Sequence, residues 1–209
     1  GGAVYNFTGP QGFGIANMAD SLYAIKTLVY DEKKVTIEEY KKALENNYGK
    51  PLSDKETEKI AVGILKSMAD SGIEINDEIV ARVIKEASGG GCSREDKEKY
   101  DKLLEMIDEI PKFGNDNSTV DAFARDVAYT YTRPLEKYKN PRGGQFQAGL
   151  YPVSANVPLG AQTGATPDGR FAHTPVADGV SPAAGRDVNG PTAAANSVSR
   201  LDHYIASNG

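Results

Sequence analysis

The sequence predicts an α/β protein, with a mainly helical part over residues 1–140 and a segment of short strands and loops over residues 141–209. Two observations support this division. In the first part, apolar residues recur at helical spacing behind residues that cap helices. The same part holds most of the Lys, Glu and Asp, whereas Gly, Pro, Ala, Ser and Val dominate the second part.

The first predicted helix begins at Ile15. Its apolar residues recur three or four positions apart, which is the spacing of one helix face. We therefore expect this face to pack on a core through Ile15, Met18, Leu22, Ile25, Leu28 and Val29.

Further helix starts are predicted by residues whose side-chain oxygens can accept a hydrogen bond from a first-turn amide. Four residues have this pattern: Thr36, Ser53, Asn76 and Ser93. A last long helix of this part is expected from about Thr119 to Tyr138. Pro134 should kink it, because proline lacks an amide donor and crowds the preceding turn.

The periodicity changes beyond Asn140. Residues 145–151 and 153–159 are short runs broken by Gly149, Pro152 and Pro158, and we expect them to be strands. Residues 166–169 read Thr-Pro-Asp-Gly, which predicts a type I turn. A final helix is expected over residues 192–203.

Composition excludes several classes of protein. A net charge of −5 gives no broad basic surface for nucleic acid. No apolar run approaches the roughly 18 residues of a membrane-spanning helix. A single cysteine, Cys92, rules out an intrachain disulfide framework. We expect a cytoplasmic protein that binds neither nucleic acid nor membrane.

Catalytic motifs within the chain are weak. Residues 9–14 precede a helix but lack both the GKS or GKT ending and the GxGxxG spacing, so a tight turn is favoured over nucleotide binding. His173 and His203 have no Cys or acidic residue at ligand spacing, which argues against zinc. Ser154, His203 and Asp178 could form a triad on paper, but no GxSxG elbow supports it.

Cys92 is interpreted as a non-catalytic cysteine and not as a nucleophile. It lies between a glycine run and a charged helix, and the sequence indicates no partner base for it. The first residues are Gly1-Gly2-Ala3 and the last are Ser207-Asn208-Gly209. We expect both ends to be internal to a longer polypeptide.

Four stretches resemble the glycyl radical enzymes related to pyruvate formate-lyase. They are YNFTGPQGFGIANMADSLYAIKTLVY from Tyr5, KFGNDN from Lys112, GLYPVSANVPLG from Gly149 and GATPDGR from Gly164. The closing run from Ala177 is similar to the glycerol and propanediol dehydratase and choline lyase branch. The resemblance covers nearly the whole chain and weakens between about Tyr48 and Ile110.

The resemblance implies a ten-stranded glycyl radical enzyme barrel with outer helices, of which this chain is part of the second half. Residues 1–140 would then be the mainly helical outer layer of the pyruvate formate-lyase-like domain. Residues 141–209 would be the Gly-rich strand and loop segment that lines the barrel interior. The chain would be one incomplete domain.

The resemblance also implies that the radical Cys and Gly lie outside this chain, in a GCxE-type loop upstream and an RVxGY-type loop downstream. Neither motif occurs here, and Cys92 matches neither. No catalytic residue is therefore assigned. No bound cofactor or metal is expected, because a separate radical S-adenosylmethionine activase installs the glycyl radical.

The implied activity is that of a glycyl radical lyase or dehydratase, which eliminates water or an amine from a small hydroxylated substrate. The isolated chain should be inactive, and the full-length protein should form a homodimer in the cytoplasm, with a bacterial microcompartment as an alternative location. Two other functions stay open: part of a formate C-acetyltransferase, or a non-catalytic scaffold.

Three residues match family positions that face substrate: Gln147, Tyr151 and Val153. Their alternation places them on one strand face. Gln147 and Tyr151 stand where isethionate lyases have Arg and Phe, which argues against a sulfonate substrate because Gln147 has no charge to pair with one. Tyr151 could instead be a buried structural aromatic. Arg170 is expected to pair with internal groups and not to be catalytic.

Overall fold

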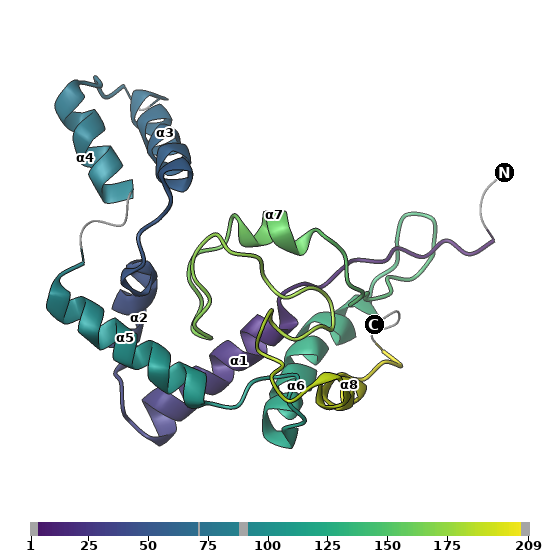
Figure 1. Ribbon diagram of the computed structural model, residues 1–209. Coiled ribbons are helices and arrows are strands. Elements are labelled where there is room, and N and C mark those ends of the chain that lie inside the picture. Colours follow the sequence, from purple (N-terminus) through teal and green to yellow (C-terminus); the bar gives the residue numbers. More distant parts are fainter. Residues whose placement is uncertain (1–3, 71, 88–91, 206–209) are drawn as a thin grey trace.

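The computed structural model describes residues 4–70, 72–87 and 92–205, and this part of the chain is mainly helical (Figure 1). Besides the α-helices it contains a π-helical segment, η1, and a 3-10 turn, η2. The helical elements in chain order are α1 (Ile15–Ile25), η1 (Lys26–Asp31), α2 (Ile37–Glu45), η2 (Asn47–Gly49), α3 (Asp54–Asp70), α4 (Asp77–Ala87), α5 (Arg94–Glu109), α6 (Ser118–Leu135), α7 (Asn156–Gly160) and α8 (Pro191–Ser199).

Helices α1 and α6 lie side by side at the centre of the larger core (Figure 1). The predicted packing face of α1 is wrong at two positions, because Met18 and Leu22 are 53% and 43% exposed. Apart from Ile15, the face that packs is made of small and polar residues: Ala16, Asn17, Ala19, Asp20, Ser21 and Ala24. Small side chains let the two helix backbones approach closely, and Tyr23 and Phe123 meet edge to face at 5.4 Å.

A second core lies between α2, α5 and the end of α1. Its fully buried aromatic residues are Tyr40 and Tyr48, each 1% exposed. Helix α5 contributes the buried Leu103 and Ile107 to this core, and the buried Ile110 follows its last residue. Three of the predicted caps are confirmed: Thr36 forms a full capping box, and Asn76 and Ser93 each accept from a first-turn amide.

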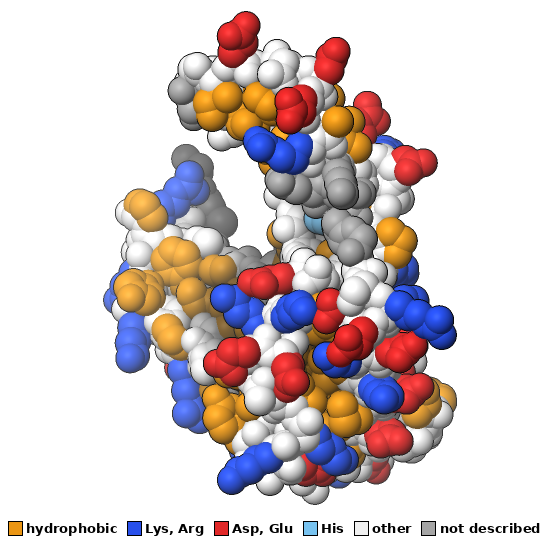
Figure 2. Space-filling view, turned by 90° about the vertical axis from the view of Figure 1, so that its left-hand side faces the viewer, with side chains coloured by type: hydrophobic (Ala, Val, Ile, Leu, Met, Phe, Trp, Pro, Cys, Tyr) orange, Lys and Arg blue, Asp and Glu red, His pale blue; other side chains and the backbone are white. Residues whose placement is uncertain are grey.

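Helices α3 and α4 form a hairpin that projects from the rest of the chain (Figure 1). Its small hydrophobic centre holds the buried Ala61 and Val83, with partly buried apolar residues packed around them. Figure 2 shows this hairpin at the top, with apolar side chains along it and charged side chains of both signs on the lower part of the same face. The hairpin falls in the region where the family resemblance is weakest.

The N-terminal extended segment runs parallel to residues 145–151. Two isolated parallel bridges link them, Thr8 with Phe146 and Gln11 with Gly149. Main-chain hydrogen bonds of 2.8 to 3.0 Å join the two segments in both directions. The first predicted strand is therefore extended backbone, although no continuous strand forms within residues 4–70, 72–87 and 92–205.

The second predicted strand, over residues 153–159, is wrong. The chain instead turns into the short helix α7, despite the β-propensity of Val157. Tertiary packing explains the difference: a Cβ on Gly160 would come within 2.3 Å of the carbonyl oxygen of Thr174. Because Gly160 has no side chain, the end of α7 can pack directly against the backbone of residues 174–176.

Two helices end earlier than the sequence predicts. Helix α6 stops at Leu135, one residue beyond Pro134, and not at Tyr138. Helix α8 begins at Pro191 as its fixed φ favours, but it stops at Ser199. Across the residues described, no helix is both long enough and apolar enough to cross a membrane.

Candidate functional site

The three residues predicted to face a substrate lie on one short stretch of chain. Gln147 is exposed, and Tyr151 and Val153 are half-buried. The intervening Ala148 and Leu150 are 3% and 0% exposed, so the side chains alternate as they do on a strand. Gln147 and Tyr151 therefore share the face that points away from the core, and Val153 follows just before the turn into α7.

Two glycines, Gly149 and Gly179, allow close packing around this stretch. A Cβ on Gly149 would come within 2.6 Å of ring atom Cε1 of Tyr151, so the tyrosine ring lies against the glycine backbone. On the other side, a Cβ on Gly179 would come within 2.1 Å of the carbonyl oxygen of Leu150. A larger residue at Gly149 would displace the Tyr151 ring, and one at Gly179 would displace the backbone of Leu150 and Tyr151.

Two polar groups beside this stretch have buried atoms without a hydrogen-bond partner in the described part of the chain, the Tyr131 hydroxyl and the Gln11 side-chain nitrogen. Burial, and to a lesser degree the nearby Tyr151, raises the pKa of Tyr131. Tyr131 lies on α6, and helical spacing in the sequence does not show where its hydroxyl points.

The Thr-Pro-Asp-Gly turn docks onto α1 through the buried Asp168. Asn17 Nδ2 donates to Asp168 Oδ2 at 2.6 Å, and Asn17 Oδ1 accepts from Ala177 N at 2.7 Å. Asp168 N donates to Ser21 Oγ at 3.2 Å. One helix face thus holds both the turn and the chain that follows it.

Two buried tyrosines hold the same turn from the opposite side. Tyr40 Oη donates to Pro167 O at 2.6 Å, and Tyr48 Oη donates to Thr166 O at 2.8 Å. Burial raises the pKa of each phenol well above its ordinary value, so both stay protonated donors. The turn is fixed by its backbone carbonyls as well as by its aspartate.

Tyr48 reaches the turn from a left-handed backbone. Its φ is 53°, and that of Asn47 is 50°, a conformation that costs a bulky residue roughly 1–2 kcal/mol. The Asn47 side chain stabilises it by accepting from Ala172 N at 2.7 Å and donating to Lys50 O at 2.9 Å. The strain is therefore held in place by contacts to the Gly-rich segment.

Arg170 behaves as the sequence predicts, as an internal partner of backbone carbonyls. Its guanidinium donates to Phe171 O at 3.1 Å and Thr174 O at 2.6 Å, and also to Gly164 O. These bonds close the loop around the arginine, so its role in this part of the chain is structural.

A buried acid and a buried base lie behind the turn. Burial raises the pKa of Asp20 to about 7, against the opposing effect of the Phe113 amide, which donates to Asp20 at 2.8 Å. The nearby Asp168 also raises it. Lys112 Nζ donates to the carbonyls of Ile107 and Ile110, and burial lowers the pKa of this lysine.

The two histidines contact backbone carbonyls. His173 Nδ1 lies 2.8 Å from Ala161 O, and His203 Nε2 lies 2.7 Å from Val198 O. In the described residues, no three His, Cys, Asp or Glu side chains are grouped as a metal site would require. Cys92 is half-buried, and burial raises the pKa of its thiol, which disfavours a reactive thiolate.

Most of the residues that position the turn and the Tyr151 stretch lie in a region that matches a family model. The model of a family described as pyruvate formate lyase-like matches residues 1–160, which is most of the chain. The chain belongs to the pyruvate formate lyase-like family of glycyl radical enzymes. Asn17, Ser21, Tyr40, Tyr48 and Tyr151 all lie inside the matched region.

Relatives of this pyruvate formate lyase-like chain include dehydratases. A solved structure titled for 1,2-propanediol dehydration in Roseburia inulinivorans is 60% identical, with a TM-score of 0.87 over 100% of this chain and 25% of that chain. The glycerol-bound, B12-independent glycerol dehydratase of Clostridium butyricum is 44% identical, with a TM-score of 0.72 over 100% of this chain and 20% of that chain.

A curated relative, the probable dehydratase YbiW of Escherichia coli, is 34% identical over 207 residues, 96% of this chain and 20% of its own length. The chain therefore spans a fifth to a quarter of the length of these proteins. Its likeness to these glycyl radical enzyme structures confirms the prediction that the chain is part of a glycyl radical enzyme fold.

Proposed function

We propose that this chain is part of a glycyl radical dehydratase that removes water from a small 1,2-diol. The observation that carries the proposal is the 60% identity, over the whole chain, to the Roseburia structure of 1,2-propanediol dehydration. Loss of water from a 1,2-diol yields an aldehyde, so the reaction is redox-neutral. Elimination of an amine from an amino alcohol is the same class of reaction.

The Tyr151 stretch would supply the substrate contacts of this chain. The Tyr151 hydroxyl can donate to, or accept from, a substrate hydroxyl, and Val153 offers an apolar contact to the carbon chain. Gln147 carries no charge and so suits a neutral diol better than a sulfonate. The close packing at Gly149 and Gly179 would help keep water from this wall.

In the full-length protein, we propose that residues 145–151 join the ten-stranded barrel and that α1 to α6 belong to its outer layer. Support comes from the parallel extended pair and from the side chains that alternate along it. The remaining strands would come from the rest of the polypeptide. In the relatives, the part outside the matched region is three to four times as long as this chain.

The radical carriers are proposed to be a cysteine and a glycine elsewhere in that polypeptide, with the glycyl radical installed by a separate radical S-adenosylmethionine activase. The isolated chain would then bind no radical and be inactive. We also propose a homodimer that acts in the cytoplasm or in a bacterial microcompartment. Formate acetyltransferase activity is not favoured, because the relatives described above are dehydratases by name.

The proposal is tested with the full-length protein and its activase under anaerobic conditions. Electron paramagnetic resonance would measure the glycyl radical, and gas chromatography would measure aldehydes formed from 1,2-propanediol and glycerol. We expect a radical signal and an aldehyde. Formation of acetyl-coenzyme A from pyruvate and coenzyme A, with no aldehyde from either diol, would support the acetyltransferase instead.

A further inference from the structure

We propose that Gln11 is a positioning residue for the dehydration, and that its side-chain nitrogen donates a hydrogen bond to the Tyr151 hydroxyl in the complete enzyme. The inference rests on the proposed function, in which Tyr151 contacts the diol. It adds a second segment to the substrate wall, because Gln11 precedes α1 whereas Tyr151 lies in the Gly-rich part of the chain.

The pairing of the N-terminal segment with residues 145–151 places Gln11 directly opposite Gly149. Gly149 N donates to Pro10 O and Gly12 N donates to Gly149 O, both at 2.8 Å, which is the hydrogen-bond pattern of a parallel bridge. Residues opposite each other in such a pair have their side chains on the same face. Gln11 therefore shares the face of Gly149 and of Tyr151, which follows two residues later.

The opposite face of the same pair is closed by the core. A Cβ on Gly12 would come within 2.7 Å of Leu150 Cδ2 and within 2.9 Å of Tyr131 Cε1. Leu150 itself is 0% exposed. Because side chains alternate along an extended segment, Gly12 faces the core and Gln11 faces away from it, on the side that carries Tyr151.

The Tyr151 ring lies beside Gln11 on this face. Gly149 has no side chain, so the ring folds over its backbone, where a Cβ would come within 2.6 Å of Tyr151 Cε1. Paired extended segments lie about 4.8 Å apart. A glutamine side chain is long enough to bring its nitrogen to the phenol across that gap.

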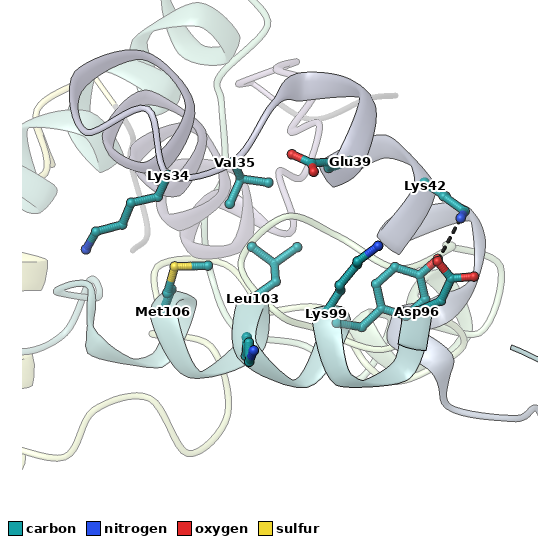
Figure 3. Close-up of a pocket in the computed structure, with 10 residues that line it drawn as sticks. Lys34, Val35, Glu39, Lys42, Asp96, Lys99, Leu103 and Met106 are labelled. Atoms are coloured by element: carbon teal, nitrogen blue, oxygen red, sulfur yellow. Dashed lines mark hydrogen bonds and ion pairs between the residues drawn. The ribbon is translucent and has the colours of Figure 1, made fainter. Parts of the chain in front are cut away.

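The Gln11 amide has an unused donor at this place. Its side-chain nitrogen is buried and has no hydrogen-bond partner within residues 4–70, 72–87 and 92–205. Polar groups in the groove between α2 and α5 differ in this respect, since Lys42 pairs there with Asp96 at 2.8 Å (Figure 3). A buried N–H without a partner destabilises a protein, and a bond to Tyr151 in the complete enzyme would remove that cost.

The Tyr151 hydroxyl can accept one hydrogen bond and donate another at the same time. With Gln11 donating to its oxygen, Tyr151 directs its own proton toward a hydroxyl group of the diol. Hydrogen bonds that form a chain strengthen one another, so the amide makes Tyr151 a better donor. Gln11 acts through Tyr151 and does not itself touch the substrate.

The first test measures kcat/KM for 1,2-propanediol with the activated full-length protein, normalised to its glycyl radical content. Gln11→Met keeps a side chain of similar length without the donor and should lower kcat/KM about tenfold. Gln11→Glu keeps the shape but replaces the donor by an acceptor, and should lower it at least as much. Gln162→Met is the matched control, because the exposed Gln162 amide donates to Pro158 O at 3.2 Å, and its activity should stay within about twofold of the parent.

A double-mutant cycle separates positioning of Tyr151 from a general effect on the fold. In a Tyr151→Phe background, Gln11→Met should lower kcat/KM by less than about twofold more, because the hydroxyl on which it acts is gone. A loss of the same size in both backgrounds would overturn the proposal. A Gln11→Met enzyme as active as the parent, or one no less active than Gln162→Met, would overturn it too.

Fluorine NMR of the full-length protein labelled with 3-fluorotyrosine tests the contact without relying on turnover. The signal of Tyr151 is the one that is lost in Tyr151→Phe. We expect Gln11→Met to shift this signal and Gln162→Met to leave it in place. A parent protein that carries the radical but forms no aldehyde would end the proposed function, whereas a Tyr151 signal unchanged by Gln11→Met would overturn the present inference, whatever the substrate.

Discussion

Asn17 Nδ2 lies 2.6 Å from Asp168 Oδ2, and both residues are buried although they are 151 positions apart in sequence. Because the same Asn17 side chain also accepts from Ala177 N at 2.7 Å, one amide fixes both the Thr-Pro-Asp-Gly turn and the chain beyond it. This single side chain thus ties two separate parts of the Gly-rich segment to α1.

Replacing Asn17 by Ala should lower the free energy of unfolding by about 3 kcal/mol, because a buried carboxylate oxygen and a buried amide each lose their partner. Asn196 is a matched control, since its exposed amide donates to Asp116 at 2.9 Å. Asn196→Ala should cost less than about 1 kcal/mol. Urea unfolding measures both, and equal losses would contradict the role given to Asn17.

The buried Asp20 should make stability depend on pH. Its pKa is raised from 3.8 to about 7 by burial, so the folded chain binds more protons than the unfolded chain between these values. Stability therefore falls as pH rises from about 4 to about 7 and then levels off.

Asp20→Asn removes this titration. The free energy of unfolding of the variant minus that of the parent should increase across the same pH window, by up to about 4 kcal/mol. Urea unfolding from pH 4.5 to pH 8 measures the difference, with the exposed Asp126→Asn as control. Parallel pH curves for the parent and Asp20→Asn would show that Asp20 does not titrate as described.

Arg200 joins α8 to α6 through a buried carboxylate. It pairs with Asp121, whose side chain is 0% exposed, and with Asp116 at 2.6 Å. Arg200→Met should cost about 2 kcal/mol, less than for a fully buried pair because the arginine side chain is 41% exposed.

Adding Asp121→Asn to the Arg200→Met variant should recover part of that loss, because no buried charge is then unpaired. Asp116→Asn, at the more exposed contact, should cost less than about 1 kcal/mol. Thermal unfolding compares the four proteins. If the double variant is less stable than Arg200→Met alone, the loss does not come from an unpaired charge.

Gly149 and Gly164 offer a matched pair of substitutions in the full-length enzyme. A Cβ at Gly149 would meet the Tyr151 ring at 2.6 Å, whereas a Cβ at Gly164 meets nothing within 4 Å. Gly149→Ala should lower kcat/KM for the diol about tenfold or more by moving Tyr151, and Gly164→Ala should leave it nearly unchanged. If the Gly149→Ala and Gly164→Ala variants are equally active, the position of the Tyr151 ring does not matter for turnover of the diol.

The helices could be predicted because their caps are local. Thr36 and Glu39 satisfy each other's backbone amides within one turn, so four residues of sequence contain the whole signal. The turn at Asp168 and the internal role of Arg170 were predictable for the same reason, since Pro, Asp and Gly set that backbone themselves.

The packed face of α1 was not predictable from apolar spacing. Asn17, Asp20 and Ser21 occupy core positions because their partners, Asp168, Phe113 N and Asp168 N, come from far along the chain. A polar stripe at helical spacing was the available signal. The strand predicted over residues 153–159 failed for a similar reason. Gly160, at the end of α7, packs against the backbone of Thr174, and local sequence does not show that contact.

The most direct test is the rate of propanal formation from 1,2-propanediol by the activated full-length protein, normalised to the glycyl radical counted by electron paramagnetic resonance. The account predicts turnover by the parent protein and a loss of about tenfold or more in Tyr151→Phe at an equal radical content. A parent protein that carries the radical but forms no aldehyde, or a Tyr151→Phe variant that is as active as the parent, would contradict it.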